Sequence, residues 1–279
     1  MDPQPLEILV CADGCTDDTV AMLRRDFPMF KVFENFPSQG SVAARDRLLR
    51  QAKGEIVVSL DDDSYPVAND FFARLEPVIQ AHPEAAVITF PELHDGNIYA
   101  VASKTLDVLG HYVSAYANCG AVMKREFYLQ QAGFPKFFVH MYEEPDYALQ
   151  CYASEAAVWF EPSLLIRHHQ SPQQRQPMQR HHQNARNELW SVWMRCPWPQ
   201  LPVVSLFRVW RQFRYACTEG LSWAIQEPVW WLAAIAGLLK CWRNRKPIPW
   251  PVYYAWMRLA RNPIFDLAGL EKILWGKGK

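Results

Sequence analysis

Three consecutive aspartates, Asp61, Asp62 and Asp63, directly follow an apolar run at residues 55–60. A run this rich in Ile and Val predicts a buried strand. Ligands of open α/β sheets bind at the carboxyl ends of strands. Three packed carboxylates repel one another unless a cation is near, and Mg²⁺ usually binds one or two carboxylates together with phosphate oxygens. The triplet therefore favours a metal and diphosphate site; the alternative is a solvated acidic turn.

Charge is distributed unevenly along the chain. Of the 279 residues, half are hydrophobic, which allows a large α/β domain with an extension and argues against wholesale disorder. Residues 1–172 carry 24 acidic and 13 basic side chains, a net charge of −11, whereas residues 173–279 carry 5 and 16, a net charge of +11. The acidic part suits a metal-dependent site, and the basic, aromatic-rich part suits an anionic surface such as membrane headgroups.

Cysteine usage and the chain's beginning predict a cytoplasmic protein, and the basic C-terminal part suggests contact with the inner face of the cell membrane. The seven cysteines are scattered and form no zinc-binding pattern, so we expect reduced thiols. Residues 1–5 contain neither a basic nor an apolar signal segment. The apolar stretch at 229–239 is shorter than the roughly 20 residues needed to span a bilayer.

Apolar runs alternate with helical patterns over most of the chain. We expect strands at 6–11, 31–33, 55–60, 86–90, 120–123, 157–160 and 164–166, and helices at 16–27, 41–52, 69–81, 126–131 and from 144. This alternation predicts a mixed, largely parallel sheet covered by helices, in a domain over residues 1–172. A linker at 173–202 and a basic, aromatic helical extension at 203–279 are expected to follow, whereas 101–116 fits either helix or strand.

Several short motifs, in this order, resemble those of a family 2 glycosyltransferase of the GT-A type. Together they cover residues 6–170: Val10–Thr19, Gly40–Gly54, Leu60–Pro66, Cys119–Arg125 with Ala132–Phe134, Tyr142–Leu149, and the strand into Arg167–His169. A narrower resemblance, to bacterial enzymes of surface-polysaccharide synthesis including rhamnosyltransferase-like ones, rests on the spacing and on Asn184-X-X-Asn187.

The resemblance implies a donor site for a nucleoside-diphosphate sugar with Mn²⁺ or Mg²⁺. Asp13 would contact the nucleobase, and Asp62 the ribose or the metal. Asp61 and Asp63 form an Asp-X-Asp pattern in which Asp63 is the expected metal ligand. Arg45 would lie near the diphosphate and His168 near the metal; as alternatives, Asp13 is a turn residue, Arg45 caps its helix and His168 is structural.

The resemblance also implies a catalytic base at Glu144, beside Glu143 and Asp146. In an inverting transfer, a carboxylate removes the acceptor's proton while the metal stabilises the leaving diphosphate. The implied acceptor is a glycan or a lipid-linked molecule. The alternative for these acids is a helix start that is enriched in negative charge because of the helix dipole.

Two departures from the family pattern bear on activity. The family's first strand, with a Pro-Thr-Tyr-Asn-like segment, has no counterpart here, since the chain begins at what corresponds to the second strand; open sheet edges are then expected. Ala12 and Glu144 stand where the family usually has Asp. The extra methylene of Glu144 moves its carboxylate by about 1 Å, and such a displacement can cost about 100-fold in rate.

Three other functions stay open. A nucleotidyltransferase normally carries a Gly-rich loop with Arg and Lys near its N-terminus, and this sequence has none. An inactive, truncated homologue would retain only membrane or partner binding. We expect no nucleic-acid partner, although the basic tail makes duplex DNA binding the third alternative.

The basic tail itself allows two arrangements. The Trp- and Arg-rich segments at 207–214, 230–245 and 253–261 are either core helices or an amphipathic face on the inner leaflet. Peripheral membrane contact through 203–279 is the expectation, given the +11 charge of residues 173–279. His181 and His182, next to Arg180, are expected in a solvated linker.

Overall fold

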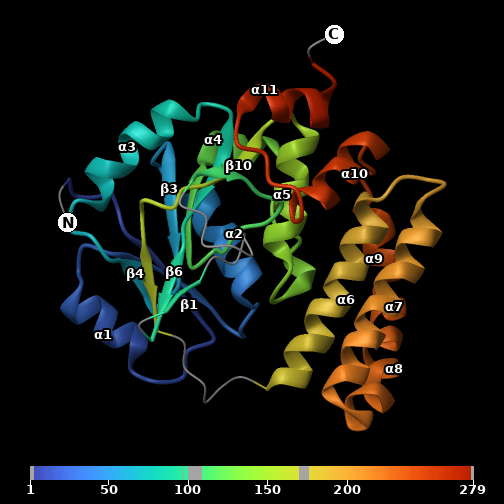
Figure 1. Cartoon of the computed structure of the whole chain (residues 1–279). Coiled ribbons are helices and arrows are strands. Elements are labelled where there is room, and N and C mark those ends of the chain that lie inside the picture. The colour runs from blue at the N-terminus through green and yellow to red at the C-terminus, as the bar shows by residue number, and fades with distance from the viewer. Residues whose placement is uncertain (1–2, 96, 100–108, 170–175, 278–279) are drawn as a thin grey trace. The chain divides into compact units, whose positions relative to one another are not determined.

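The computed structural model describes residues 3–95, 97–99, 109–169 and 176–277. The chain divides into two compact units, each described by itself below (Figure 1). The first unit comprises Met1–Gln170 with Trp256–Lys279, and the second comprises Ser171–Ala255. The C-terminal residues therefore group with the α/β part, whereas the sequence suggested that they belong to the helical extension.

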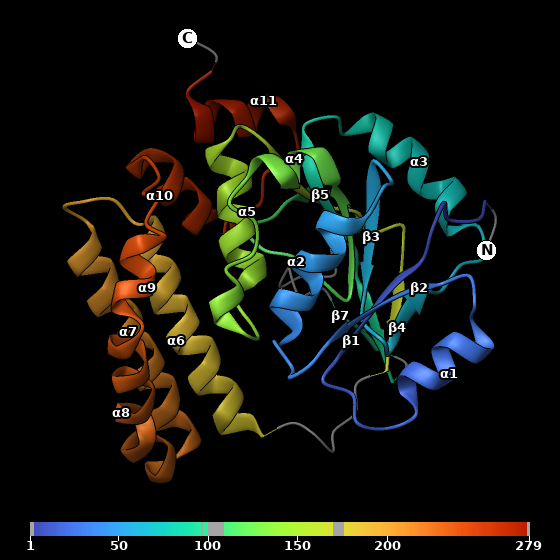
Figure 2. The same ribbon diagram turned by 180° about the vertical axis from the view of Figure 1, so that it is seen from behind.

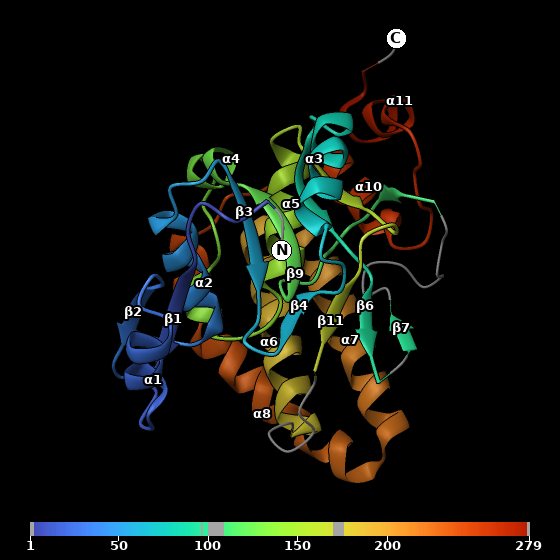
Figure 3. The ribbon, with the colours of Figure 1, turned by 90° about the vertical axis from the view of Figure 1, so that its left-hand side faces the viewer.

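A five-stranded mixed sheet forms the centre of the first unit, in the order β3–β9–β5–β10–β8. These strands are β3 (Ile56–Leu60), β9 (Gly120–Lys124), β5 (Ala85–Thr89), β10 (Ala157–Phe160) and β8 (His111–Tyr112). β9 runs antiparallel between β3 and β5, and β5 pairs with β10 in parallel. Figure 3 shows β9 beside β3. Every residue of β5 and β10 is buried, as their apolar sequences require.

A second, four-stranded sheet has the order β4–β11–β6–β7. Its members are β4 (Ser64–Pro66), β11 (Ile166–His168), β6 (Glu92–His94) and β7 (Asn97–Tyr99). β11 lies antiparallel to β4, with His168 opposite Ser64, and parallel to β6. Figure 3 shows this sheet beside β9. It brings the turn after β3 next to the ends of β6 and β11.

The third sheet is the parallel pair of β1 (Leu9–Asp13) and β2 (Lys31–Asn35). Within the described residues, β1 pairs only with β2 and β3 only with β9, and both strands are largely of intermediate exposure. The α/β class is thus as expected and the sheets are mixed, but antiparallel pairs outnumber parallel ones among the described strands. The reason is that β9 runs antiparallel to both β3 and β5, and β11 runs antiparallel to β4.

Helices cover these sheets and connect their strands. Figure 2 shows α2 and α5 in front of the strands. The helices of the first unit are α1 (Thr19–Asp26), α2 (Ser41–Gln51), α3 (Phe71–Ala81), α4 (Arg125–Gln130), α5 (Glu143–Ala153), α11 (Leu267–Leu270), the 3₁₀ turn Lys136–Phe138 and the π-helical turn Glu271–Trp275. Residues of the C-terminal segment bond back to the α/β part: Trp256 Nε1 donates to Ser114 O at 2.8 Å, and Trp275 Nε1 donates to Tyr152 O at 2.9 Å.

The second unit is helical. Its elements are α6 (Pro177–Arg195), α7 (Leu201–Glu219), α8 (Leu221–Ala236), α9 (Leu238–Arg243) and the start of α10 (Trp250–Leu259). α6, α7 and α8 contact one another in pairs and lie side by side (Figure 1). The segment suggested as a linker at 173–202 therefore contains a 19-residue helix.

The expectation that His181 is solvated is wrong. His181 is buried on α6, and its Nε2 lies 2.7 Å from Glu227 Oε1 of α8. Glu227 is fully buried and also accepts a hydrogen bond from Trp230 Nε1 at 2.8 Å. The polar composition of this segment hides an amphipathic helix whose buried face includes His181, whereas Arg180 and His182 are only partly buried.

Two expectations concern segments that are hard to interpret from sequence. The first half of 101–116, residues 101–108, lies outside the described residues, and within the second half His111–Tyr112 form β8. None of the described helices combines the length and the apolar character needed to cross a bilayer.

Candidate functional site

The aspartate triplet forms a tight turn after β3. Asp61 N donates to Ser64 Oγ at 2.8 Å, and Ser64 N donates to Asp61 O at 3.1 Å. One potential ligand atom from each of Asp61, Asp63 and His168 lies within 4.8 Å of the others. Asp62 is exposed and lies outside this group. Two carboxylates with one imidazole suit a divalent cation such as Mn²⁺ or Mg²⁺.

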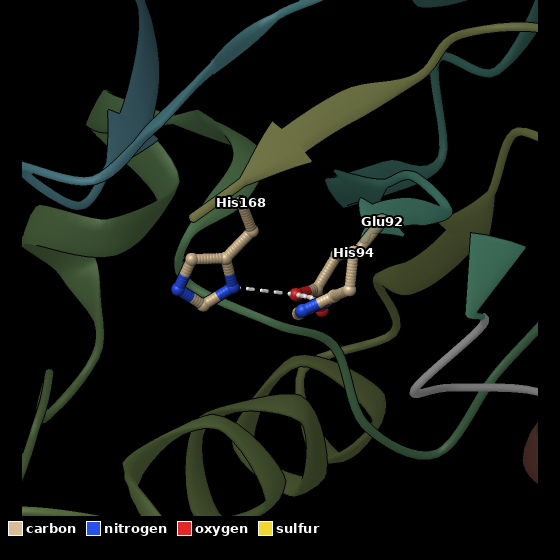
Figure 4. Close-up of side chains that lie close together, drawn as sticks. All are labelled: Glu92, His94 and His168. Atoms are coloured by element: carbon tan, nitrogen blue, oxygen red, sulfur yellow. Dashed lines mark hydrogen bonds and ion pairs between the residues drawn. The ribbon is translucent and has the colours of Figure 1, made fainter. Parts of the chain in front are cut away.

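The orientation of His168 between two carboxylates is compatible with a metal ion at this group. Its Nδ1 lies 2.8 Å from Glu92 Oε2 (Figure 4), and its Nε2 lies 3.1 Å from Asp63 Oδ1. An ionised carboxylate only accepts hydrogen bonds, so Nδ1 carries the proton that Glu92 accepts. In the neutral ring, the lone pair of Nε2 then faces another carboxylate, and a cation between the two removes that repulsion.

Arg45 connects this metal group to a second acidic group. It projects from α2, its guanidinium contacts Asp61, and its Nη1 lies 3.1 Å from Glu143 Oε1. Burial alone lowers the pKa of Arg45, but the charges of Asp61 and Glu143 raise it above its ordinary value. A permanently charged guanidinium here suits a diphosphate, as the sequence suggested.

Asp13, at the end of β1, organises the loop before α2. Its Oδ2 accepts hydrogen bonds from Ser38 Oγ at 2.5 Å and Gly40 N at 2.8 Å, and its Oδ1 accepts from Asn35 Nδ2 at 2.8 Å and Gln39 N at 2.9 Å. Partial burial raises the pKa of Asp13, but these four bonds lower it below its ordinary value. Asp13 therefore shapes the loop directly; its contact with a nucleobase stays a prediction.

The three acids suggested for the base position have different surroundings on α5. Glu143 is 1% exposed and pairs with Arg45, and Asp146 is fully buried, with Oδ2 accepting from Gln150 Nε2 at 2.9 Å. Glu144 alone of the three is partly exposed. Burial raises the pKa of Glu144, the charge of Glu143 raises it further, and Arg45 partly offsets both. Access and a raised pKa make Glu144 the best candidate for a general base.

Strained backbone precedes this helix. Val139, Met141 and Tyr142 have φ values of 68°, 73° and 70°, in the left-handed region that is costly for residues other than glycine. Gly40, with φ 89°, packs so closely that a Cβ there would lie 2.3 Å from Val139 O. The loop that Asp13 orders therefore also supports the segment that positions Glu144.

Three residues that the sequence did not single out lie next to this site. Glu92 and His94 lie on one face of β6, and Glu92 Oε2 is 2.8 Å from the Nε2 of His94. Asn118 Nδ2 lies 3.3 Å from Glu143 Oε1. A Glu-X-His alternation after a buried strand was the available signal for the first two, whereas Asn118 had none beyond its place before Cys119.

The sequence of residues 2–132 matches the family described as Glycosyl transferase family 2. No curated protein is close enough in sequence to count as a relative. Three solved structures illustrate the likeness of fold. A mannosyltransferase, PcManGT of Pyrobaculum calidifontis in complex with GDP-Man and Mn²⁺, has a TM-score of 0.54 at 20% identity, over 98% of this chain and 79% of that one.

The other two are more distant in sequence. S. aureus TarS 1–349 in complex with UDP-GlcNAc has a TM-score of 0.59 at 14% identity, over 84% of this chain and 72% of that one. GalNAc-T7 with UDP, GalNAc and Mn²⁺ has a TM-score of 0.55 at 16% identity, over 70% of this chain and 43% of that one. The chain thus spans less than half the length of GalNAc-T7. These likenesses show the fold, which is the GT-A type expected from the sequence.

Proposed function

We propose that this chain belongs to glycosyl transferase family 2, whose pattern matches residues 2–132, and that it transfers a sugar from a nucleoside-diphosphate donor to an acceptor hydroxyl. One observation carries the proposal: Arg45 contacts both Asp61, in the metal group, and Glu143, beside the candidate base. A single displacement at a sugar carbon needs a leaving-group site and a base close together, on opposite sides of that carbon. The UDP, GDP-Man and Mn²⁺ in the solved structures of similar fold support the same chemistry.

Asp63, Asp61 and His168 would hold Mn²⁺ or Mg²⁺ at the donor diphosphate. The metal, when bound, neutralises the charge that develops on the leaving diphosphate. Arg45 adds a fixed positive charge beside it and keeps Asp61 in place. Asp62 is exposed at the same turn, where it would meet the ribose, and Asp13, which orders the loop before α2, would contact the nucleobase.

Glu144 acts on the acceptor. As the acceptor oxygen bonds to the anomeric carbon, the bond from that carbon to the diphosphate oxygen breaks, and Glu144 takes the hydroxyl proton. This displacement inverts the anomeric configuration. Glu143 and Asp146 have positioning roles, because one is paired with Arg45 and the other is buried within α5.

The acceptor is a glycan or a lipid-linked molecule at the cytoplasmic face of the membrane, and the second unit supports this part of the proposal. The outer face of α8 consists of side chains that are more than half exposed, Leu221, Ile225, Val229, Leu232 and Ile235. The only charged residue of α8, Glu227, is buried. Exposed Lys240, Arg243 and Lys246 follow this face in the sequence. An apolar face next to basic residues fits an anionic lipid surface.

Thermal unfolding with nucleotides tests the donor site. The full chain is heated with UDP, GDP and dTDP, each with and without Mn²⁺, beside Asp63→Ala and Glu144→Gln. We expect one nucleotide to raise Tm only with Mn²⁺, Asp63→Ala to lose that shift, and Glu144→Gln to keep it. A folded wild-type protein with no shift for any nucleotide would overturn the proposal and favour the inactive homologue.

Vesicle sedimentation tests the membrane contact separately. We expect the chain to bind vesicles with about one third anionic phospholipid more tightly than neutral ones, and less tightly as salt rises. Replacing Ile225 and Leu232 together with Ser removes apolar area and should weaken binding about tenfold or more. Met29→Ser, at an exposed apolar residue of the first unit, is the matched control. Equal binding by all three proteins would contradict the assignment of this face.

A further inference from the structure

We infer that Glu92, His94 and His168 form a second cation site in the first unit, one that takes Zn²⁺ or a similar transition metal. One potential ligand atom from each residue lies within 4.8 Å of the others. The Nε2 of His94 and the Nδ1 of His168 both lie 2.8 Å from Glu92 Oε2 (Figure 4). The site shares His168 with the proposed donor metal site but uses the other nitrogen of its ring.

Sheet register brings the three side chains together. β6 and β11 are parallel neighbours, with Glu92 opposite Ile166. His94 lies two residues after Glu92, and His168 two residues after Ile166, so all three side chains emerge on the same face of this small sheet. The arrangement depends on paired backbone strands rather than on loops, which favours a site of defined geometry.

The donor set distinguishes this site from the one at Asp61 and Asp63. Two imidazoles with one carboxylate are a common zinc ligand set, whereas two carboxylates with one imidazole are richer in the oxygen ligands that Mn²⁺ and Mg²⁺ prefer. Glu92 is 3% exposed and His168 9%, so a cation here would be largely shielded from water. The His94 side chain is 13% exposed, which leaves a route for the ion to enter.

The two sites exclude each other because of the chemistry of one ring. A neutral imidazole has one lone pair on a ring nitrogen, and the other nitrogen carries the proton. Zn²⁺ at Nδ1 displaces the proton that Glu92 accepts; this proton moves to Nε2, which then donates to Asp63 and no longer binds a metal. Zinc should therefore weaken metal-dependent donor binding, a consequence that rests on the proposed function, whereas the zinc site itself does not.

Zinc binding is measured first on the full chain without nucleotide, by competition with a chromophoric zinc indicator. We expect His94→Ala to weaken zinc binding by about tenfold or more. His169→Ala, at an exposed neighbour that contacts Tyr65, is the matched control and should bind zinc as the wild type does. Asp63→Ala should also keep zinc binding, because Asp63 belongs to the other site. His94→Gln, which retains a polar side chain of similar length, replaces His94→Ala if the latter does not fold.

A second measurement tests the competition. Zinc should abolish the Mn²⁺-dependent nucleotide shift of the wild type, and His94→Ala should need about tenfold more zinc for the same effect. Zinc binding that is equal in His94→Ala and His169→Ala, or that is lost in Asp63→Ala, would overturn the inference. Absence of any nucleotide shift would count against the proposed donor site, while the indicator titration would still decide the zinc site.

Discussion

Arg45 of α2 and Glu143 of α5, 98 residues apart in the sequence, form an ion pair in which Nη1 and Oε1 are 3.1 Å apart. The same guanidinium contacts Asp61 at the end of β3. One guanidinium thus interacts both with the acidic turn after β3 and with the first turn of α5, where Glu144 lies. A change of charge at Asp61 or Arg45 should therefore alter the protonation of Glu144.

This relationship predicts the pH dependence of the reaction. Burial and the charge of Glu143 raise the pKa of Glu144 to about 8, and a general base works only when deprotonated. kcat/KM should therefore rise with pH through about 8, rather than near the ordinary Glu value. Arg45 lowers the pKa of Glu144, so Arg45→Met should move the midpoint of the profile to higher pH.

Rate profiles from about pH 6 to about pH 10 measure this shift. Arg74→Met is the control, because Arg74 bonds to the carbonyl oxygen of Ser163, away from these acids. A midpoint for Arg45→Met at or below the wild-type value would show that Arg45 does not influence the base.

The sequence was sufficient for the parts of the site that depend on local patterns. The apolar run at 56–60 and the acids directly after it predicted the strand and the acidic turn that the structure has, because a strand end and its side chains are set by neighbours in the chain; ligand binding at this turn stays a prediction. The Glu-rich start of α5 was visible for the same reason. The GT-A fold followed from the order of such motifs.

Long-range relationships were not available from those patterns. The pairing of β11 with β6 brings His168 to Glu92, and no spacing in the sequence encodes that contact. β6 has only three residues, so its Glu-X-His alternation was too short to predict a strand by itself. The polar composition of α6 suggested a linker. The residue that pairs with buried His181, Glu227, lies on α8, and the sequence of α6 alone does not reveal it.

Substitutions at Glu144 separate chemistry from binding. Glu144→Gln removes the proton acceptor but keeps the shape, so kcat should fall by about 10²- to 10⁴-fold while the nucleotide-dependent Tm shift persists. Asp146→Asn, at a buried acid, should instead lower stability with a smaller effect on the rate. The measurements are steady-state kinetics and thermal unfolding of both variants. A Glu144→Gln enzyme that retains full activity would assign the base elsewhere.

Glu92 should affect the affinity of the donor site for Mn²⁺ without touching that ion. Glu92→Gln replaces the carboxylate that fixes His168 Nδ1–H with an amide, which can present a donor to that nitrogen and so release the ring. Loss of such a supporting carboxylate typically weakens metal binding about 10- to 100-fold. Titration of Mn²⁺ at saturating nucleotide measures this affinity. Glu84→Gln, at a carboxylate bonded to Tyr112, is the control, and equal Mn²⁺ affinities for the two variants would argue against the support of His168 by Glu92.

Asp13 should contribute stability that depends on pH. The pKa of Asp13 is lower in the folded protein than in the unfolded chain, where it is about 4. Its contribution to the free energy of unfolding is therefore fully present above that pH and is lost as the pH falls through the folded-state pKa. Asp13→Asn should cost about 2 kcal/mol at neutral pH, since hydrogen bonds to a charged group are lost, and the cost should shrink in acid. Urea unfolding at several pH values measures the difference. Asp18→Asn, at an exposed residue, is the control; a cost for Asp13→Asn that does not change with pH would contradict the ionised role.

A substitution at Gly40 tests whether the loop ordered by Asp13 helps to position Glu144. Gly40→Ala places a Cβ 2.3 Å from Val139 O and forces an L-residue to adopt φ 89°, so the 139–142 segment must move. We expect a loss of about 2 kcal/mol or more in the free energy of unfolding, and a fall in kcat larger than the change in nucleotide affinity. Gly220→Ala also has a positive φ, 123°, but its Cβ meets nothing within 4 Å, so it reports the backbone strain alone. Of these two glycines, Gly40 is the one that contacts the segment before α5. A kcat defect of equal size in Gly40→Ala and Gly220→Ala would therefore mean that this contact does not position Glu144.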